Sequence, residues 1–325
     1  MNIKLMKHIM TAVMLAVSFL ATTSCAGLVV RGVADALTAS TGTTFTGEDD
    51  PELVGDAIPF ALKLYDSLLA SAPDHQKLLI ANGSYYIMYA NAFVQGPAAM
   101  LPMEDFEKKD AMLKRSKNLY LRGRDMVLTA LELKYNGLTN AIPIDQGTKF
   151  DAILKRMNRD DVTALYWCSA GWVAAFSLDS FDLGLSMSVP RAAAMMKRAE
   201  ELWPDYNNGT IYDFFISFYG GLPAALGGSK DLARSYFIKA TNVSKGTSAS
   251  PYVAMATSIA IPAQDYVLYT NMLTTAAEVN PDKNISNRLA NIISIRKAHF
   301  LMKNAGEYFL IDDGDANKDA APAKK

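Results

Sequence analysis

Few side chains in this 325-residue sequence have the types and spacing that catalysis or metal binding needs. It contains 3 His and 2 Cys, and His75 and His299 stand far apart in the chain. Two isolated imidazoles make neither a zinc site nor a catalytic triad. Cys168 lies in the apolar stretch Tyr-Trp-Cys-Ser-Ala, which favours a buried, unreactive thiol over a nucleophile. We therefore predict a protein that is not an enzyme and has no catalytic residue, metal site or cofactor.

Two further patterns resemble chemical sites but have structural explanations. The segment Gly227-Gly228-Ser229-Lys230 lacks the spacing of a phosphate-binding loop, and we interpret Ser229 as the cap of the helix that follows. Paired acids fall at expected helix starts or in the tail, where a carboxylate favours the positive end of the helix dipole. These pairs are Asp49-Asp50, Asp160-Asp161 and Asp312-Asp313. With a net charge of −1 and no Lys/Arg cluster, the chain is not expected to bind nucleic acid.

The first residues have the order of a secretory signal. Lys4 and Lys7 precede the apolar run 9–20, and small residues then lead into Cys25. A cysteine at this place is typical of a bacterial lipoprotein, in which the thiol is acylated, for example with palmitate, and becomes the first mature residue. We predict a lipoprotein signal peptide over 1–24 and lipidation of Cys25. Ordinary signal cleavage nearby is the alternative.

The residues around Cys25 refine this prediction. Thr22 stands where the common lipoprotein motif prefers Leu, a departure that relaxed versions of the motif share. Ala26 follows the cysteine, in place of the Asp that commonly retains lipoproteins in the inner membrane. We therefore expect a periplasmic protein, tethered by its acyl chains to the inner leaflet of the outer membrane. Residues 25–50 would connect the lipid anchor to the folded body, as a lipidated N-terminus with a possible first helix and a linker.

An internal repeat organises the rest of the chain. Apolar periodic segments end in Pro-Asp at Pro73, Pro204 and Pro281, and the residues twelve, eight and five positions before each proline align with a small-large-small pattern, although Leu68 and Tyr269 are large where that pattern has a small residue. This is the pattern of the second helix of a tetratricopeptide (TPR) unit, where small residues let two helices approach and proline ends the second. Two segments that reach Tyr135 and Lys245 keep the spacing without the proline. The patterned residues are Ala61, Tyr65 and Leu68; Gly123, Val127 and Ala130; Ala192, Met196 and Ala199; Ala233, Phe237 and Ala240; and Tyr269, Leu273 and Ala276.

Each of these second helices needs a partner before it in the chain. Helical candidates lie at about 28–39, 77–95, 161–179, 208–220 and 250–260, and no comparable run alternates as a strand would. We predict an all-α fold, a TPR-like solenoid of stacked antiparallel helix pairs over 51–311, with insertions at 96–106 and 136–149. The segment 286–304 would be a C-terminal capping helix. Residues 312–325 have no large apolar side chain and should form a disordered tail.

From Gly47 to Phe309 the sequence resembles the T component of TRAP-type (tripartite ATP-independent periplasmic) transporters, a family of TPR-like periplasmic lipoproteins. Gly123 departs from the Ala usual in the family's Arg-Ala-Arg form, and Cys168 from a small or hydroxyl residue. The matching stretches are Asp49-Asp50-Pro51-Glu52-Leu53, Tyr89-Ala90-Asn91-Ala92-Phe93-Val94-Gln95, Tyr120-Leu121-Arg122-Gly123-Arg124-Asp125, Asp161-Val162-Thr163-Ala164-Leu165-Tyr166-Trp167, Asn208-Gly209, Gly227-Gly228-Ser229, Ala249-Ser250-Pro251-Tyr252-Val253 and Asn287-Arg288-Leu289-Ala290-Asn291.

The resemblance implies a non-enzymatic lipoprotein scaffold that binds the solute-binding P component of such a transporter. It would assist uptake of an organic ligand, either hydrophobic or an organic acid, and assemble as a homo-oligomer. The 50 % hydrophobic residues and 16 Met permit an apolar channel, although a thick core explains them as well. The alternative is a general periplasmic protein-interaction scaffold for envelope assembly, unrelated to transport.

Polar and aromatic residues of the matching stretches are the candidates for partner or ligand binding. Tyr89, Asn91 and Gln95 do not share one face of a helix, so only part of this set can point into a groove, whereas Asn287 and Asn291 share a face. Arg122 and Arg124 would meet an acidic partner or a carboxylate. The simpler explanation is that they pair with Asp125, with Glu132 or with neighbouring helices. We expect Trp167 and Trp172 to be packing residues.

Overall fold

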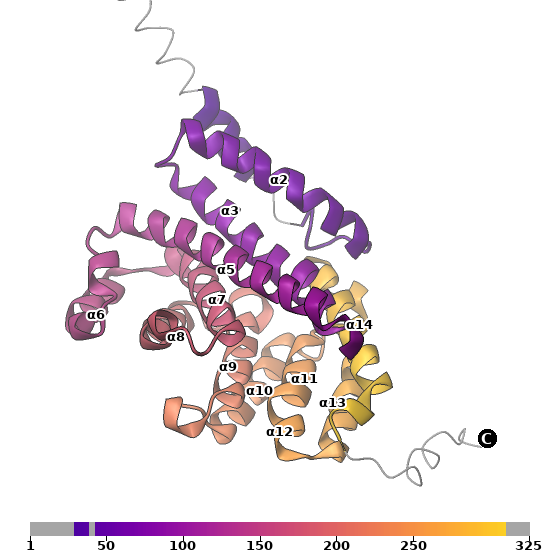
Figure 1. Cartoon of the computed structure of the whole chain (residues 1–325). Helices are drawn as coiled ribbons and strands as arrows, with labels where there is room; N and C mark the ends of the chain where they lie inside the picture. Colours follow the sequence, from indigo (N-terminus) through magenta and orange to yellow (C-terminus); the bar gives the residue numbers. More distant parts are fainter. Residues whose placement is uncertain (1–28, 39–42, 310–325) are drawn as a thin grey trace, which may run out of the picture.

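The computed structural model describes residues 29–38 and 43–309, and in this part of the chain all regular structure is helical (Figure 1). The predicted signal peptide 1–24, Cys25 and the predicted tail 312–325 lie outside the described residues. Residues 29–38 are helical, in the place of the possible first helix. The all-α prediction is confirmed for the described chain.

Successive helices pack against one another along the chain. Their bounds are α2 (Pro51–Ser71), α3 (Gln76–Tyr89), α4 (Gly96–Ala99), α5 (Phe106–Lys134), α6 (Gly147–Arg156), α7 (Val162–Leu178), α8 (Leu183–Leu202), α9 (Thr210–Gly221), α10 (Lys230–Ser244), α11 (Ser250–Met255), α12 (Ile261–Ala263), α13 (Tyr266–Ala277) and α14 (Arg288–Lys303). Two π-helical turns, Ala90–Gln95 and Ala256–Ala260, continue α3 into α4 and α11 into α12.

The predicted helix ends agree closely with the structure. The second helices were expected to stop before Pro73, Tyr135, Pro204, Lys245 and Pro281, and α2, α5, α8, α10 and α13 end within four residues of these positions. The expected partners correspond to residues 29–38, to α3 with its π turn, and to α7, α9 and α11. The small and large residues of the repeat are mostly buried: Ala192, Met196 and Ala199 of α8, for example, are all 0 % exposed.

Side-chain caps explain where several helices begin. The Asp50 carboxylate accepts a hydrogen bond of 3.0 Å from the Leu53 N–H, and Pro51 follows at the first helical position of α2. The Ser229 hydroxyl accepts one of 3.2 Å from the Leu232 N–H, so the predicted cap of α10 is confirmed. Both caps satisfy backbone donors that have no partner inside the helix.

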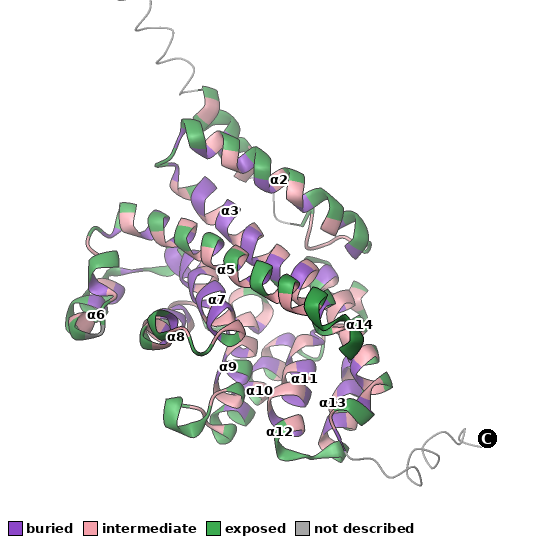
Figure 2. Cartoon of the chain, in the orientation of Figure 1, coloured by how far each residue is buried: buried purple, intermediate pink, exposed green. Residues whose placement is uncertain are grey.

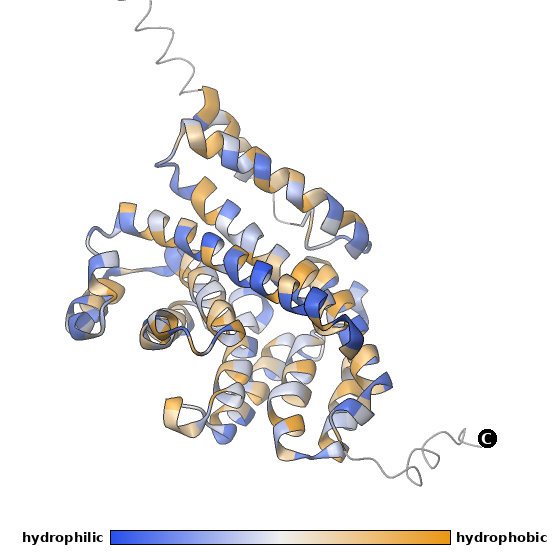
Figure 3. Ribbon diagram, viewed as in Figure 1, coloured by the Kyte–Doolittle hydropathy of each residue, from blue (hydrophilic) through white to orange (hydrophobic). Residues whose placement is uncertain are grey.

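Three glycines bring α3, α5 and α7 unusually close together. A Cβ on Gly123 would lie 2.5 Å from the Gly83 carbonyl oxygen, and one on Gly171 would lie 2.7 Å from Ile87. Buried residues concentrate on α3 and α7, whereas the side of α5 seen in this view is mostly exposed and hydrophilic (Figures 2 and 3). The glycines therefore fix the spacing of the central helices, because any side chain there would push them apart.

The second predicted insertion carries a helix that the sequence did not reveal. After the 3₁₀ turns Thr139–Ala141 and Ile144–Gln146, α6 packs against α8 with Phe150 and Leu154 buried. The Arg191 guanidinium lies 5.2 Å from the centre of the Phe150 ring. A helix of ten residues that buries two side chains gives too short a periodic pattern to stand out in a sequence.

The last helix returns to the first ones. We predicted a cap over 286–304, and α14 does end the series, but it also contacts α2 and the segment before α2. The Leu289 N–H donates a 2.9 Å hydrogen bond to the Thr46 carbonyl, and Arg288 pairs with Asp49 at 2.9 Å. Leu289 also joins the buried cluster of Val54 and Ile58. The described helices thus form a ring that closes on itself, a feature that an open stack with a terminal cap lacks.

Candidate ligand-binding cavity

A cavity of about 1000 Å³ lies between the helices of this ring. Its walls come from α3 and its π turn, from α5, α7, α9 and α14, and from the loops before α9, α11 and α14. Solvent reaches it, because the lining residues Asn91 and Ser217 are exposed. A cavity of this size suits a small organic molecule.

Aromatic and aliphatic side chains form most of the cavity wall. Trp167 of α7 faces it together with Phe214 and Phe218 of α9, whose stacked rings have centroids 5.7 Å apart. Ile293 of α14 adds an aliphatic surface. This lining favours a ligand with an apolar body.

The π-helical turn Ala90–Gln95 supplies one set of polar groups to the cavity. The Asn91 side-chain amide donates a 3.2 Å hydrogen bond to the Tyr120 hydroxyl, which in turn donates to the Gln95 amide oxygen. Burial is the main cause that raises the pKa of Tyr120, so this hydroxyl keeps its proton. π turns are frequent at functional sites because they realign side chains within a helix.

A second polar set joins the starts of α9, α11 and α14. The Asn287 side-chain amide lies 3.4 Å from the Ser248 hydroxyl, and the Ser248 and Ser250 hydroxyls are 3.1 Å apart. The Ser250 hydroxyl donates to the carboxyl of Asp213. The chain of groups ends at this carboxyl, which faces the cavity.

Asp213 stands in an unusual environment for a carboxylate. Burial raises its pKa to about 7, and the hydrogen bond from Ser250 lowers it only in part. Among the cavity-lining residues that the structure describes, Asp213 carries the only charge. Asp213 therefore changes charge near neutral pH at the wall of an otherwise uncharged cavity.

The structure brings three of the predicted binding residues to the cavity. Asn91, Gln95 and Asn287 line it. Asn291 shares the face of Asn287, at 3.3 Å between their side chains, but it is fully buried and bonds the backbone of the loop before α11. Tyr89 packs elsewhere, with its ring 5.9 Å from that of Phe93.

Both candidate arginines pair within the chain. Arg122 lies 2.8 Å from the Asp66 carboxylate and its guanidinium covers the Tyr86 ring at 4.6 Å. Arg124 pairs with Asp125 at 2.6 Å, as its simpler explanation predicted, and it covers the Trp172 ring at 5.0 Å. Asp66 lies on α2, so the pair of Arg122 with another helix also follows the simpler explanation.

Sequence reasoning missed most of the cavity-lining residues, among them Trp167 and Asp213. Trp167 was expected to be a packing residue, yet its side chain lines the cavity, whereas Trp172 is buried and donates a 3.0 Å hydrogen bond to Ser188. Asp213 was not singled out. The sequence does contain a signal for Asp213, because it is the sole charged residue in Thr210–Gly221. An acid in an otherwise apolar helix is rare unless it is paired or functional.

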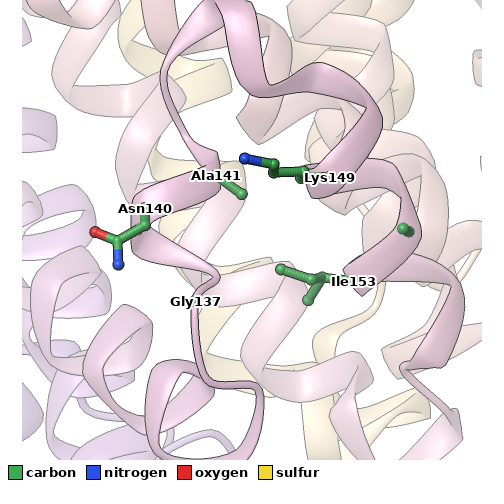
Figure 4. A pocket seen from close by; sticks show the side chains of 6 residues that line it. Gly137, Asn140, Ala141, Lys149 and Ile153 are labelled. Atoms are coloured by element: carbon green, nitrogen blue, oxygen red, sulfur yellow. The ribbon is translucent and has the colours of Figure 1, made fainter.

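A smaller pocket of about 420 Å³ lies at the α6 insertion (Figure 4). Ile153 and Lys149 of α6 face Ala141 across it, while the Asn140 side chain points away. It has no converging polar groups and lies apart from the central cavity, so it is the weaker candidate.

The described residues hold no cluster of three or more His, Cys, Asp or Glu side chains that could bind a metal ion. His75 serves as the N-cap of α3, where its Nδ1 accepts a 3.2 Å hydrogen bond from the Leu78 N–H. None of the helices in 29–38 and 43–309 combines the length and apolarity that crossing a membrane requires.

Cys168 is expected to resist alkylation as long as the chain is folded. Its side chain is fully buried, and burial raises the pKa of the thiol to about 12, so almost no thiolate exists at neutral pH. Iodoacetamide labelling at pH 8, mapped by peptide mass spectrometry, should modify Cys168 only after denaturant is added. Labelling at equal rates with and without denaturant would contradict this burial.

Together the helical ring and the cavity define an all-helical protein with a central cavity. A family model described as "TRAP transporter T-component" matches residues 47–309, and the chain belongs to this family. Membership gives it a role in TRAP transport as an accessory protein, outside the known enzyme families. A protein of Treponema pallidum (strain Nichols), named only as uncharacterized, is 35 % identical over 266 residues, which cover 82 % of each chain.

Proposed function

We propose that this chain is a periplasmic lipoprotein, anchored through Cys25 to the inner leaflet of the outer membrane, that binds the solute-binding P component of a TRAP transporter. It holds an organic, largely apolar ligand and assists its uptake. Family membership supports the association with other transporter components. The observation that carries the ligand-binding role is the cavity of about 1000 Å³ with its aromatic wall.

The scaffold of this proposal is a TPR-like series of helix pairs, which the repeat pattern of the sequence and the packing of successive helices support. Exposed apolar side chains on the outer side of α2 support assembly into a homo-oligomer: Leu53 is 56 % and Phe60 75 % exposed. Burying them against a second copy would remove apolar surface from water.

A cavity-filling variant tests the function. Ala174 of α7 lines the cavity, so Ala174→Trp should displace a ligand, whereas Ala70→Trp adds the same ring at an exposed position of α2. We would capture proteins from native periplasmic extract with the full chain and both variants, and identify proteins and small molecules by mass spectrometry.

We expect a periplasmic solute-binding protein in all three captures and a small molecule that only Ala174→Trp loses. Capture of envelope assembly factors without a solute-binding protein would favour the general scaffold instead. A small molecule retained equally by Ala174→Trp would show that the cavity does not hold it.

A further inference from the structure

The charged side chains that line the cavity are of one sign. None of the lining residues that the structure describes is Lys, Arg or His, and Asp213 is the single acid. An anionic ligand would therefore meet no counter-charge at the wall and would lie near a carboxyl. A cationic ligand would find a counter-ion.

The groups packed around Asp213 leave it without a cationic partner among the described residues. Ser250 of α11 donates to it, and Tyr166 of α7 is near enough that the Asp213 charge contributes to raising the pKa of the Tyr166 hydroxyl, after burial. The 3₁₀ turn Tyr206–Gly209 and the π turn Ala256–Ala260 contribute no charged side chain.

Cations of α8 and α10 lie on another side of α9. Lys197 of α8 covers the Phe215 ring at 4.4 Å, and Lys239 of α10 covers the Tyr212 ring at 5.5 Å. Both lysines are paired with Glu200, at 3.1 and 3.0 Å. Their charges are therefore compensated away from Asp213.

The aromatic wall adds a second feature that favours a cation. Outside the cavity, arginines and lysines cover ring faces, as Arg159 does for Trp203 at 4.0 Å. The rings of Trp167, Phe214 and Phe218 in the cavity have no such protein cation over them. Aromatic rings that no described protein cation covers, in the same cavity as a carboxyl, are recognition elements for an ammonium group, although Phe214 and Phe218 also stack on each other.

We propose that the cavity selects molecules with a protonated amine on an apolar body, with Asp213 as the counter-ion and the ring faces of Trp167, Phe214 and Phe218 around the apolar part. This inference rests on the proposed function and narrows its ligand class. It sets aside the organic acid that the family resemblance left open.

Lys297 provides the strongest competing site. It stands on α14 one helical turn after Ile293 and Ser294, which line the cavity, but it is not itself among the lining residues. Burial lowers its pKa. An organic acid would have to bind there, so the experiment includes Lys297.

The test compares three probes with the same ten-carbon chain: decylammonium, decan-1-ol and decanoate. Their binding to the purified full chain is measured by isothermal titration calorimetry in detergent-free buffer at pH 5.5 and pH 8. At pH 8 we expect decylammonium to bind about tenfold more tightly than decan-1-ol and decanoate most weakly. Because Asp213 ionises around pH 7, decylammonium affinity should rise by up to about 30-fold from pH 5.5 to pH 8, while decan-1-ol affinity stays constant.

Asp213→Asn should abolish the preference for the amine and its pH dependence, and unchanged decan-1-ol binding will show that the variant cavity is intact. A preference that persists in Asp213→Asn overturns the proposal. Decanoate binding as tight as decylammonium binding also overturns the proposal. If Lys297→Gln then abolishes decanoate binding, the anion site lies at Lys297. If decan-1-ol and both ions fail to bind, the cavity function proposed above fails as well.

Discussion

Gly123→Leu is expected to lower the free energy of unfolding by about 3 kcal/mol, the upper end of the usual cost of overpacking, because its side chain would have to enter the contact between α3 and α5. A Cβ at Gly123 would already lie 2.5 Å from the Gly83 carbonyl oxygen and 2.7 Å from Ile87. Backbone cannot rotate away as a flexible side chain can, so the two helices must separate and the packing around them is lost. Urea unfolding followed by circular dichroism measures the loss.

Gly184→Leu is the matched control. Gly184 also lies in a helix, but it is exposed, and a Cβ there would meet only the Asp182 carboxylate at an ordinary 3.4 Å. Leucine is a better helix former than glycine, so this variant should be neutral or stabilised by up to about 1 kcal/mol. If both changes destabilise the protein equally, the close approach of α3 and α5 at Gly123 is not the cause of the loss of stability.

The helices could be predicted from sequence because their signals are local. Proline after the aligned repeat positions marks where α2, α8 and α13 end, and a capping Asp or Ser marks where α2 and α10 begin. Closure of the ring could not be predicted in this way. The pair of Glu52 and Arg296 joins residues 244 positions apart, and no periodicity within one helix carries that information.

The cavity was only partly visible in the sequence. The polar residues Asn91, Gln95 and Asn287 were candidates because they stand in stretches shared with the family, but nothing local distinguishes them from Tyr89, which packs away from the cavity. Which side of a helix faces the ring interior depends on all the helices at once. The isolated Asp213 is the one lining residue whose chemistry alone could have identified it.

The carboxyl groups of Asp213 and Asp161 differ in the number of hydrogen bonds they accept. Asp161 is 4 % exposed and accepts three hydrogen bonds: 2.9 Å from the Asn158 N–H, 2.7 Å from Lys134 and 2.6 Å from the Tyr135 hydroxyl. Burial by itself would raise the pKa of Asp161, but these three donors together hold it below its usual value. A satisfied acid of this kind stabilises the fold, whereas Asp213 with its single donor remains available to a ligand.

Asp161→Ala is therefore expected to cost about 1 to 3 kcal/mol at pH 7, since it leaves the buried Tyr135 hydroxyl without its acceptor, whereas Lys134, whose side chain is 40 % exposed, can turn to water. The exposed neighbour Asp160 is the control, and Asp160→Ala should cost below about 1 kcal/mol, the size of a helix-dipole contribution.

The pH dependence of this loss separates charge from packing. Because the folded pKa of Asp161 is lowered, its stabilising effect is complete above the unfolded pKa of about 4 and fades as the pH falls through the lower folded pKa. The gap in unfolding free energy between the original chain and Asp161→Ala should therefore stay constant from pH 7 to pH 5 and narrow below pH 4. A gap that is the same at pH 3 and pH 7 would mean that the Asp161 side chain acts through its shape, and that its ionised carboxylate does not hold α5 and α7 together.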